Sequence, residues 1–302
     1  MSEVISFGGI NIDLVVYINR QPNMGETVEG DSVQFFLGGK GANQAVAASR
    51  LGVPISFVGN IGTDFFGKEV ENLLSKENIG LSMLGSVNEK TGMALINVFN
   101  DAENQIIFIP GANKATNFKQ IPKERLKNAQ IIISQMEVEI NEVEKLFVNS
   151  KQYNTLNILN IAPYKKPTRE LLVNSDILVF NELEFCLFTN SKSNSPLYLD
   201  NLKQTLDEQN FNNKQSIIIT LGGRGLVLYW NNQMEHIEGL KVNALDTVGS
   251  GDCFVGALSF SLLEGKSLKE SCEFANKSAA ISVTKKGASA SMPTIDEVVN
   301  FI

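Results

Sequence analysis

The sequence predicts an α/β fold of three layers, with helices on both faces of a mostly parallel central sheet and a small β lid beside it. Two observations lead to this prediction. Short apolar, β-rich runs alternate with helical patterns along most of the 302 residues, and such alternation is typical of parallel strands joined by right-handed crossovers. Two segments break the alternation with patterns typical of antiparallel hairpins, which predicts a further β element.

The regular part of the pattern can be assigned segment by segment. Six runs are predicted as buried strands: residues 4–8, 55–59, 130–134, 156–160, 177–180 and 216–220. Four segments between them have helical periodicity: residues 41–51, 67–77, 139–151 and 197–209. The chain contains no Ser/Gly-rich linker, low-complexity tract or internal repeat, so residues 1–302 are expected to form a single domain.

The two exceptional segments pair residues 14–18 with 27–36 and residues 91–99 with 105–109. The second pair has a predicted turn around 100–104 that is rich in Asn, Asp and Glu. These hairpins either form a small separate sheet, with lid segments at about 14–37 and 91–110, or extend one edge of the main sheet.

Composition excludes several classes of protein. The net charge of −7 argues against a nucleic-acid partner, whose phosphates require a basic surface. Cys186, Cys253 and Cys272 are scattered, which fits a reducing compartment. His236 is the only histidine and is expected at the surface, so a zinc site built from several histidines is excluded. With no basic leader and no long apolar stretch, we expect a cytoplasmic protein that does not enter a membrane.

The strongest motif is DTVGSGD at positions 246–252, followed by a helical run over 253–263. The small residues Gly249, Ser250 and Gly251 would expose backbone N–H groups at the positive end of that helix, where they can hold an oxyanion. Asp252 in the first turn could take a proton from an attacking hydroxyl, and phosphoryl transfer to an alcohol needs this combination. Equally, the segment alone is compatible with an ordinary Gly-rich turn in which Asp252 caps the helix.

Neither common nucleotide fingerprint is present at the Gly-rich loops. Lys40 follows two glycines but is followed by Gly41 rather than by Ser or Thr, so no Walker A motif occurs. At the second loop Phe254 stands where the third glycine of a dinucleotide fingerprint would fall. A dinucleotide-dependent oxidoreductase is therefore disfavoured.

Polar residues near the start of the chain are candidates for a sugar site. Asn11 and Asp13 are two apart in an extended segment at the end of the first strand, so their side chains share a direction. An amide with a carboxylate can bond several adjacent hydroxyls. The alternative is that both are turn formers. In the block GGKGANQA at 38–45, a glycine turn opens an apolar helix, Lys40 could neutralise phosphate and Asn43 would lie in the first turn; a turn of this kind is often only structural.

Asn181 and Glu184 follow the predicted strand at 177–180. Ligands of α/β sheets bind at the carboxyl ends of parallel strands. Being three residues apart, the two side chains would share a helical face, which suits hydrated Mg²⁺ and phosphate oxygens. Capping of the next helix is an equally natural role.

In order and spacing, these motifs resemble the ribokinase (PfkB) family of carbohydrate kinases over essentially the whole chain. The similarity covers residues 11–13, 25–27, 38–45, 111–113, 181–184, 220–225, 246–252 and 286–288. It implies a ribokinase-like α/β/α sandwich and transfer of phosphate from ATP to the 5-hydroxyl of D-ribose.

The resemblance also implies a role for each matching residue. The positions matching the sugar site are Asn11, Asp13, Gly39, Lys40, Asn43 and Glu137. Asp252 matches the base, and the anion hole is matched by Gly249, Ser250 and Gly251. Positions matching nucleotide contacts are Asn181, Thr220, Gly222, Gly225, Gly251 and Asn276, while Glu184 matches the residue that organises Mg²⁺. The loops that would enclose K⁺ contribute Asp246, Val248, Ser282, Lys285, Gly287 and Ser291. The hairpins match a lid that also forms a homodimer interface.

Three departures from the family pattern are present. Residues 160–163 are NIAP where the family usually has NPAP, residues 249–252 are GSGD where many members have AAGD, and Asn276 replaces a histidine found in some. None falls on a sugar-matching position, although the first borders the groove. Glu137 with Lys40 and Asn43 favours a small pentose; deoxyribose, a ketohexose or a nucleoside are the alternatives, and a non-catalytic sensor is disfavoured by the intact Asp252 and glycines.

Overall fold

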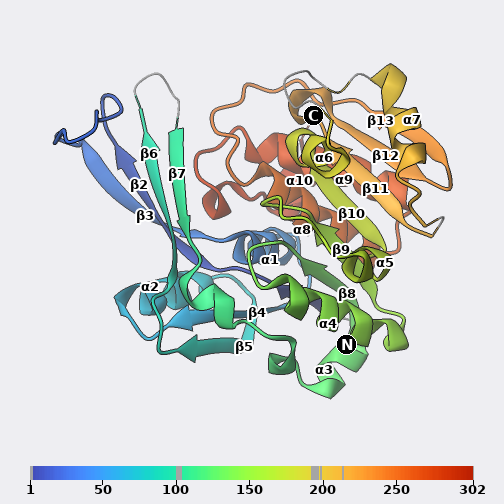
Figure 1. The fold of residues 1–302 in the computed structure, drawn as a ribbon, viewed down its shortest axis with the longest axis horizontal. Coiled ribbons are helices and arrows are strands. Elements are labelled where there is room, and N and C mark those ends of the chain that lie inside the picture. The colour runs from blue at the N-terminus through green and yellow to red at the C-terminus, as the bar shows by residue number, and fades with distance from the viewer. Residues whose placement is uncertain (1–2, 100–103, 192–196, 198, 213, 302) are drawn as a thin grey trace.

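The protein is built on two β-sheets (Figure 1). The computed structural model describes residues 3–99, 104–191, 197, 199–212 and 214–301, so most of the turn predicted at 100–104 lies outside the described residues. In the larger sheet the spatial order is β13-β12-β11-β10-β9-β8-β1-β4-β5. The strands from β5 to β11 run parallel, and β12 and β13 continue the sheet in antiparallel pairing. The predicted mostly parallel sheet is confirmed.

The strands of the larger sheet are β1 (Glu3–Phe7), β4 (Ile55–Gly62), β5 (Gly80–Val87), β8 (Ala129–Ser134), β9 (Leu156–Asn160), β10 (Ile177–Asn181), β11 (Ser216–Thr220), β12 (Leu226–Trp230) and β13 (Gln233–Ile237). All six predicted strands are present, with ends shifted by at most three residues. The predicted surface histidine, His236, lies half-buried on β13, the outermost strand.

Helices cover both faces of this sheet. One face packs against α1 (Lys40–Arg50), α2 (Phe65–Leu74), α8 (Ser250–Leu263), α9 (Leu268–Ser282) and α10 (Ile295–Val299). The other packs against α3 (Lys123–Asn128), α4 (Ile140–Ser150), α5 (Arg169–Val173), α6 (Glu182–Thr189) and α7 (Leu199–Glu208). Short 3₁₀ turns occur at Gly111–Ala115, Phe118–Gln120, Lys151–Tyr153, Gly222–Arg224 and Ser289–Ser291. Within the described ranges no helix is both long enough and apolar enough to span a membrane.

The smaller sheet has the order β3-β2-β6-β7 and is separate from the main sheet. Its strands are β2 (Asn11–Tyr17), β3 (Ser32–Gly38), β6 (Gly92–Val98) and β7 (Asn104–Ile109). The two hairpins therefore form a sheet of their own, and the alternative that they extend an edge of the main sheet is wrong. The second strand of the first hairpin begins at Ser32, not at residue 27 as predicted.

One placement predicted from the sequence is corrected. Asn11 and Asp13 do not end the first strand, because β1 stops at Phe7 and both residues begin β2. There they pair with Gly38 and Phe36 of β3 and with Gly92 and Ala94 of β6. The chain thus crosses from the main sheet to the smaller one between residues 8 and 10, and the two polar side chains belong to the smaller sheet.

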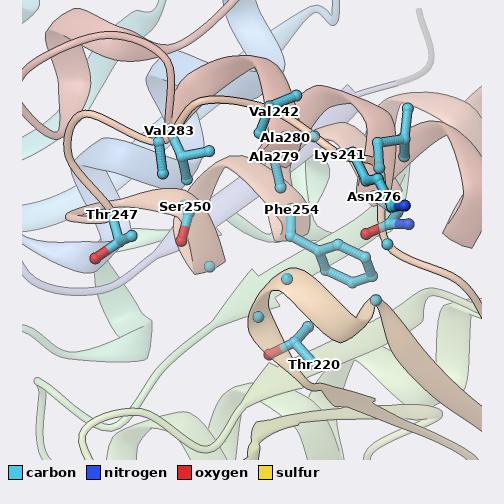
Figure 2. A pocket seen from close by; sticks show the side chains of 17 residues that line it. Thr220, Lys241, Val242, Thr247, Ser250, Phe254, Asn276, Ala279, Ala280 and Val283 are labelled. Carbon is cyan, nitrogen blue, oxygen red and sulfur yellow. The ribbon is translucent and has the colours of Figure 1, made fainter.

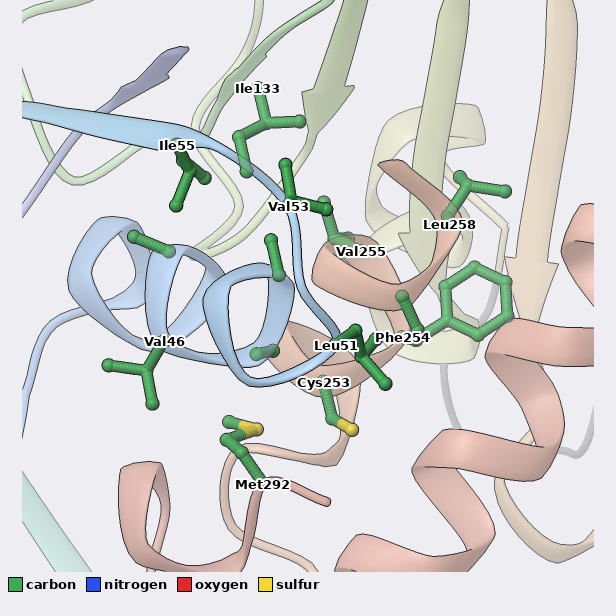
Figure 3. Packing of buried hydrophobic residues seen from close by; sticks show 14 of the residues in the cluster. Val46, Leu51, Val53, Ile55, Ile133, Cys253, Phe254, Val255, Leu258 and Met292 are labelled. Carbon is green, nitrogen blue, oxygen red and sulfur yellow. The ribbon is translucent and has the colours of Figure 1, made fainter. Parts of the chain in front are cut away.

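Close packing of α1 on α8 brings two distant parts of the sequence together (Figure 3). Figure 3 shows Val46 of α1 and Val255 of α8 within one apolar cluster. Gly256 allows this approach, since a Cβ at that position would lie 2.5 Å from the Cβ of Ala47. The start of α1 is consequently held beside the start of α8.

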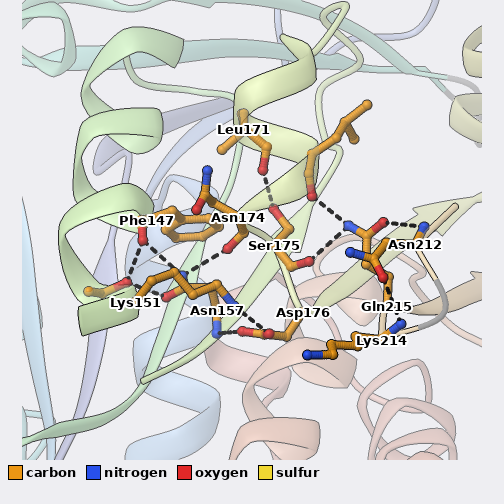
Figure 4. A network of polar contacts seen from close by, with 12 residues as sticks. Phe147, Lys151, Asn157, Leu171, Asn174, Ser175, Asp176, Asn212, Lys214 and Gln215 are labelled. Atoms are coloured by element: carbon orange, nitrogen blue, oxygen red, sulfur yellow. Dashed lines mark hydrogen bonds and ion pairs between the residues drawn. The ribbon is translucent and has the colours of Figure 1, made fainter. Parts of the chain in front are cut away.

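A polar network fixes the opposite ends of the strands (Figure 4). The carboxylate of Asp176 accepts the backbone N–H of Asn157 at 2.8 Å and pairs with Lys151. Gln215 Nε2 donates to the carbonyl of Ser175 at 2.9 Å. These contacts join the N-terminal ends of β9, β10 and β11, which are opposite to the carboxyl ends of those strands.

Candidate active site

Asp252 lies in the first turn of α8 and is almost completely buried, with 3% of its surface exposed. Two consecutive residues of α1 donate to its carboxylate: Asn43 Nδ2 to Oδ2 at 3.1 Å and Gln44 Nε2 to Oδ1 at 3.0 Å. A carboxylate has further lone pairs beyond these two. Since Asp252 also lines a cavity at the start of α8, it can accept a proton from a hydroxyl bound there.

The backbone at the start of α8 presents N–H groups to the same cavity. Gly249 precedes the helix with a φ of 79°, and a Cβ there would lie 2.9 Å from the Cα of Ala288. Both features require glycine. The N–H of Ser250 already has an acceptor at 3.3 Å, whereas those of Gly251 and Asp252 have none within the described part of the chain. Unpaired N–H groups at a helix N-terminus attract anions.

Three carboxylates and one ammonium group influence one another around Asp252. Burial, reinforced by repulsion from Glu137 and Asp252, raises the pKa of Asp13 to about 7 against the attraction of Lys40. Burial also raises the pKa of Glu137 to about 7, even though Lys40 donates its backbone N–H to Glu137 Oε2 at 2.8 Å. The pKa of Lys40 is raised, chiefly by Asp252. The cluster therefore favours a neutral, hydroxyl-rich ligand that can donate to carboxylates.

Asn11 is held by a residue outside the predicted set. Asn113 Nδ2 donates to Asn11 Oδ1 at 2.8 Å, and Asn113 Oδ1 accepts the N–H of Ile10 at 2.9 Å. Both asparagines are buried. Because its oxygen is engaged, Asn11 is left with its amide N–H groups as donors.

Two adjoining cavities meet at the start of α8. The first, of about 430 Å³, is lined by Lys40, Asn181, Glu184 and residues 249–252. The second, of about 410 Å³, is more apolar and extends between α8, α9 and the turn after β11. Both cavities are lined by Thr220, Gly222, Thr247, Ser250 and Gly251.

The second cavity has the character of a site for a flat, partly apolar group (Figure 2). Phe254 lies on its wall together with Asn276, Val242 and Ala279, as Figure 2 shows. Asn276 Nδ2 donates to the carbonyl of Glu238 at 2.9 Å. A ligand with a planar base in this cavity could therefore extend its remaining part toward the N–H groups at the start of α8.

Asn181 and Glu184 form a reciprocal cap on α6. Asn181 Oδ1 accepts the N–H of Glu184 at 2.8 Å, and Glu184 Oε2 accepts the N–H of Asn181 at 2.8 Å. The capping alternative is thus realised, while both residues also line the first cavity. Burial is the main cause of a raised pKa of Glu184, which the positive charge of Lys40 opposes.

The two loops predicted to enclose K⁺ lie in contact. Asp246 Oδ1 accepts the N–H of Val248 at 3.0 Å and Oδ2 accepts the N–H of Gly287 at 2.9 Å. The first of these bonds caps the turn that Asp246 begins. Ser282 and Ser291 are buried, and each hydroxyl donates to a carbonyl of its own segment. Lys285 forms an ion pair with Glu297.

The structure brings most predicted residues together around the start of α8. Neither cavity is lined by the sugar candidates Asn11, Asp13, Gly39, Asn43 and Glu137. They lie instead on β2, at the start of α1 and after β8, and three of them are linked to Asp252 or Lys40 by a hydrogen bond or by charge. Gly225 and Asn276 line only the second cavity.

Several residues were missed by sequence reasoning. These are Gln44, Gln135, Asn113 and Phe254. Gln44 stood inside the recognised block at 38–45, and its position beside Asn43 was an available signal. Phe254 lies two residues after Asp252 on the same helix, but it was noted only for its place in the missing dinucleotide fingerprint. Gln135 carried no signal, because only tertiary packing brings it to the site.

Comparisons with known proteins show similarity over nearly the whole chain. Residues 1–295 match the pfkB family carbohydrate kinases. A ribokinase of Haemophilus influenzae is 36% identical over 98% of this chain and 96% of its own length. A deoxyribokinase of Salmonella typhi is 30% identical over 99% of this chain and 98% of its own. The Arabidopsis thaliana ribokinase complexed with ribose and ATP superposes with a TM-score of 0.89 at 30% identity, covering 99% of this chain and 97% of that one.

Proposed function

Because the chain belongs to the pfkB family of carbohydrate kinases, we propose that it transfers the γ-phosphoryl group of ATP to the 5-hydroxyl of D-ribose, giving ribose 5-phosphate. The near-full-length similarity to ribokinases supports this substrate pair. The observation that carries the proposal is the pairing of the buried Asp252 carboxylate with unpaired N–H groups at the start of α8. That pairing joins a proton acceptor to a site for developing negative charge.

In this proposal Asp252 accepts the proton of the attacking hydroxyl. The N–H groups of the Gly249–Gly251 segment hold the transferring phosphoryl oxygens, and Lys40, which lines the same cavity, offsets their charge. Asn43 and Gln44 keep the carboxylate in place during this step. The base of the nucleotide would occupy the cavity beside Phe254 and Asn276.

The sugar would lie between the smaller sheet and α1. Asp13 and Glu137 accept its hydroxyls, while Asn11 and Asn43 supply complementary polar groups. Asn43 Oδ1 is buried and has no partner within the described residues, so a hydroxyl of the sugar would satisfy it. Gly39 is the residue that precedes α1 beside these groups.

Mg²⁺ fits the first cavity as a metal held jointly with phosphate. Within the described ranges, no group of three or more His, Cys, Asp or Glu side chains is arranged to hold an ion alone. Mg²⁺ commonly uses one or two carboxylates together with substrate phosphates, and Glu184, capped by Asn181, is the carboxylate placed for this. When bound, the ion would neutralise charge on the β- and γ-phosphates.

K⁺ fits the contact between the Asp246 loop and residues 282–291, where the donors are oxygens of a carboxylate, backbone carbonyls and serine hydroxyls. Its ligands would come from Asp246, Val248, Ser282, Lys285, Gly287 and Ser291. The ion would act by fixing the backbone that continues into Gly249.

We further propose a homodimer in which the smaller sheet is both the lid and the interface. Val33 and Phe35 on β3 and Ile107 on β7 are each about half exposed, and an apolar sheet face of this kind is typical of an association surface. A cytoplasmic location is supported by the three cysteines, which are buried free thiols.

The test is ADP release across a panel of D-ribose, 2-deoxy-D-ribose, D-fructose and adenosine, with the product phosphate located by ³¹P–¹H NMR. We expect the highest kcat/KM with D-ribose and the phosphate on O5. The deoxyribokinase relative makes deoxyribose the second candidate, and a higher kcat/KM for it would replace ribose. No turnover with any member would overturn the kinase proposal.

A further inference from the structure

Asp252 is the end of a buried chain of amide side chains. Gln135, which directly follows β8, donates Nε2 to Gln44 Oε1 at 2.7 Å, and Gln44 donates Nε2 to Asp252 Oδ1 at 3.0 Å. Both glutamines are 0% exposed. Neither lines the two cavities, so neither is placed to touch a nucleotide bound there.

Gln135 decides which end of the Gln44 amide faces Asp252. A glutamine amide has an acceptor oxygen on one side and a donor nitrogen on the other. With its oxygen held by Gln135, Gln44 must present nitrogen to the carboxylate. The reverse orientation would set Gln44 Oε1 against a carboxylate oxygen with no proton between them.

The hydrogen-bonded series Gln135–Gln44–Asp252 lowers the stability of the fold at one atom. Gln135 Oε1 is buried and has no partner within the described residues, and an unpaired buried acceptor destabilises a fold. The same oxygen packs on the backbone of Gly8, where an added Cβ would lie only 1.9 Å away. An apolar side chain at position 135 would remove this unpaired acceptor but would also take away the donor to the buried Gln44 Oε1, so the glutamine at 135 is needed for its bond to Gln44.

We propose that Gln44 and Gln135 are positioning residues for phosphoryl transfer, acting in series to fix the rotation of the Asp252 carboxylate. Asn43 holds Oδ2 and Gln44 holds Oδ1, which leaves the remaining lone pairs directed to the cavity. Without Gln44 the carboxylate keeps one of these two anchors and can rotate about it. The inference rests on the proposed kinase reaction but not on the identity of the sugar.

The test compares Gln44→Met, Gln135→Met and the double variant, using the sugar with the highest kcat/KM for the unmodified chain. Methionine keeps the side-chain length but cannot donate a hydrogen bond. We expect Gln44→Met to lower kcat about 10- to 100-fold while KM for sugar and ATP changes by less than about twofold. Gln135→Met should lower kcat in the same way but less. The double variant should be no slower than Gln44→Met, because Gln135 acts through Gln44.

Gln215→Met is the matched control. Gln215 is also buried and donates to two carbonyls, those of Leu172 and Ser175, but belongs to the network at the other ends of the strands (Figure 4). The Gln215→Met variant should have a lower midpoint of thermal unfolding and an unchanged kcat.

The inference fails if Gln44→Met keeps its kcat, if kcat and KM change by the same factor, or if the two glutamine effects add in full. Should Gln44→Met not fold, Gln135→Met decides alone, and an unchanged kcat overturns the inference. Absence of turnover in the unmodified chain would instead overturn the proposed function.

Discussion

At the scale of single residues, the proposed reaction rests on how Asp252 is held. Its carboxylate accepts from two neighbouring amides of α1 and still lines the cavity. The sequence predicted the role of Asp252 from its place at the start of a helix. Its two amide partners required the tertiary contact of α1 with α8.

Replacing Asp252 with asparagine tests its role as base. Asp252→Asn keeps the size of the side chain, and the unpaired oxygen of Asn43 gives the new amide an acceptor. Loss of proton acceptance should reduce kcat about 10²- to 10⁴-fold with the sugar Kd little changed. Stopped-flow or steady-state ADP release gives kcat, and calorimetry gives Kd. Asp207→Asn, at a surface carboxylate bonded to Tyr229, is the control; near-normal turnover in Asp252→Asn would remove the base assignment.

The raised pKa of Asp13 leads us to expect that sugar binding releases protons. Its pKa is raised to about 7 by burial and by neighbouring carboxylates, so near neutral pH part of the population is protonated. Hydroxyls that donate to the ionised form lower the pKa, and binding should therefore release a fraction of a proton at pH 7. By linkage, affinity should fall as the pH drops below 7. Calorimetry in buffers of different ionisation enthalpy measures the released protons.

Asp13→Asn separates this effect from others. The variant should bind sugar more weakly and release fewer protons. The protons that are still released would come from Glu137, whose pKa is also about 7. ATP binding should be unchanged, because Asp13 lines neither cavity. Equal weakening for sugar and ATP would mean that Asp13 has a structural role.

At the scale of elements, two loops determine the backbone at the start of α8. Asp246 accepts N–H groups from Val248 within its own loop and from Gly287 in the loop after α9. Gly249 packs directly on Ala288 of that second loop. Any change in the contact between the loops therefore moves the N–H groups that we propose hold the phosphoryl oxygens.

This arrangement predicts activation by K⁺. Replacing K⁺ with Na⁺ or Li⁺ at constant ionic strength should lower kcat, because a smaller ion would hold the loops less well. Asp246→Ala should lower kcat in K⁺ and abolish the difference between the ions. Asp296→Ala, at an exposed carboxylate on α10, should keep the K⁺ response. A rate that is indifferent to the cation would leave Asp246 as a turn cap only.

At the scale of the whole molecule, the site lies between two sheets. Asn11 and Asp13 come from the smaller sheet, whereas Lys40, Asn43 and Asp252 come from helices packed on the larger one. Any motion of the smaller sheet would therefore open or complete the proposed sugar site, which is the physical reason for proposing this sheet as a lid.

The same sheet predicts dimerisation. By strand register Phe35 and Ile107 lie in one row across the sheet, with Val33 on the same face and Asp13 on the opposite one. Val33→Asp with Ile107→Asp should convert a dimer into a monomer, since charges would be buried at the interface. Light scattering after size-exclusion chromatography gives the mass. Val299→Asp, on the exposed side of α10, should not change it, and an unmodified chain that is monomeric at micromolar concentration would contradict the interface.

The sequence by itself predicted the class of fold, which the structure confirms, and a chemistry for the Asp252 loop, which stays a prediction. Periodicity is local, so buried strands such as 156–160 and 216–220 were predicted with the bounds that the structure has. Glycines at 249 and 251 followed by a carboxylate predict an anion site with a base, because all the groups belong to one turn.

Only the tertiary structure decided which distant residues complete that turn. Residues 11 and 13 were assigned to the wrong strand, because the sequence does not show where a chain leaves one sheet for another when glycines separate the two. Gln44 had only its place beside Asn43 as a signal, because it lies 208 residues from Asp252 in the sequence. Gln135 had none, because it follows a strand of the central sheet, whereas Asp252 belongs to a helix packed on that sheet. The hydrogen bond between Gln44 and Asp252 exists because Gly256 lets α1 approach α8, and such packing depends on both partners at once.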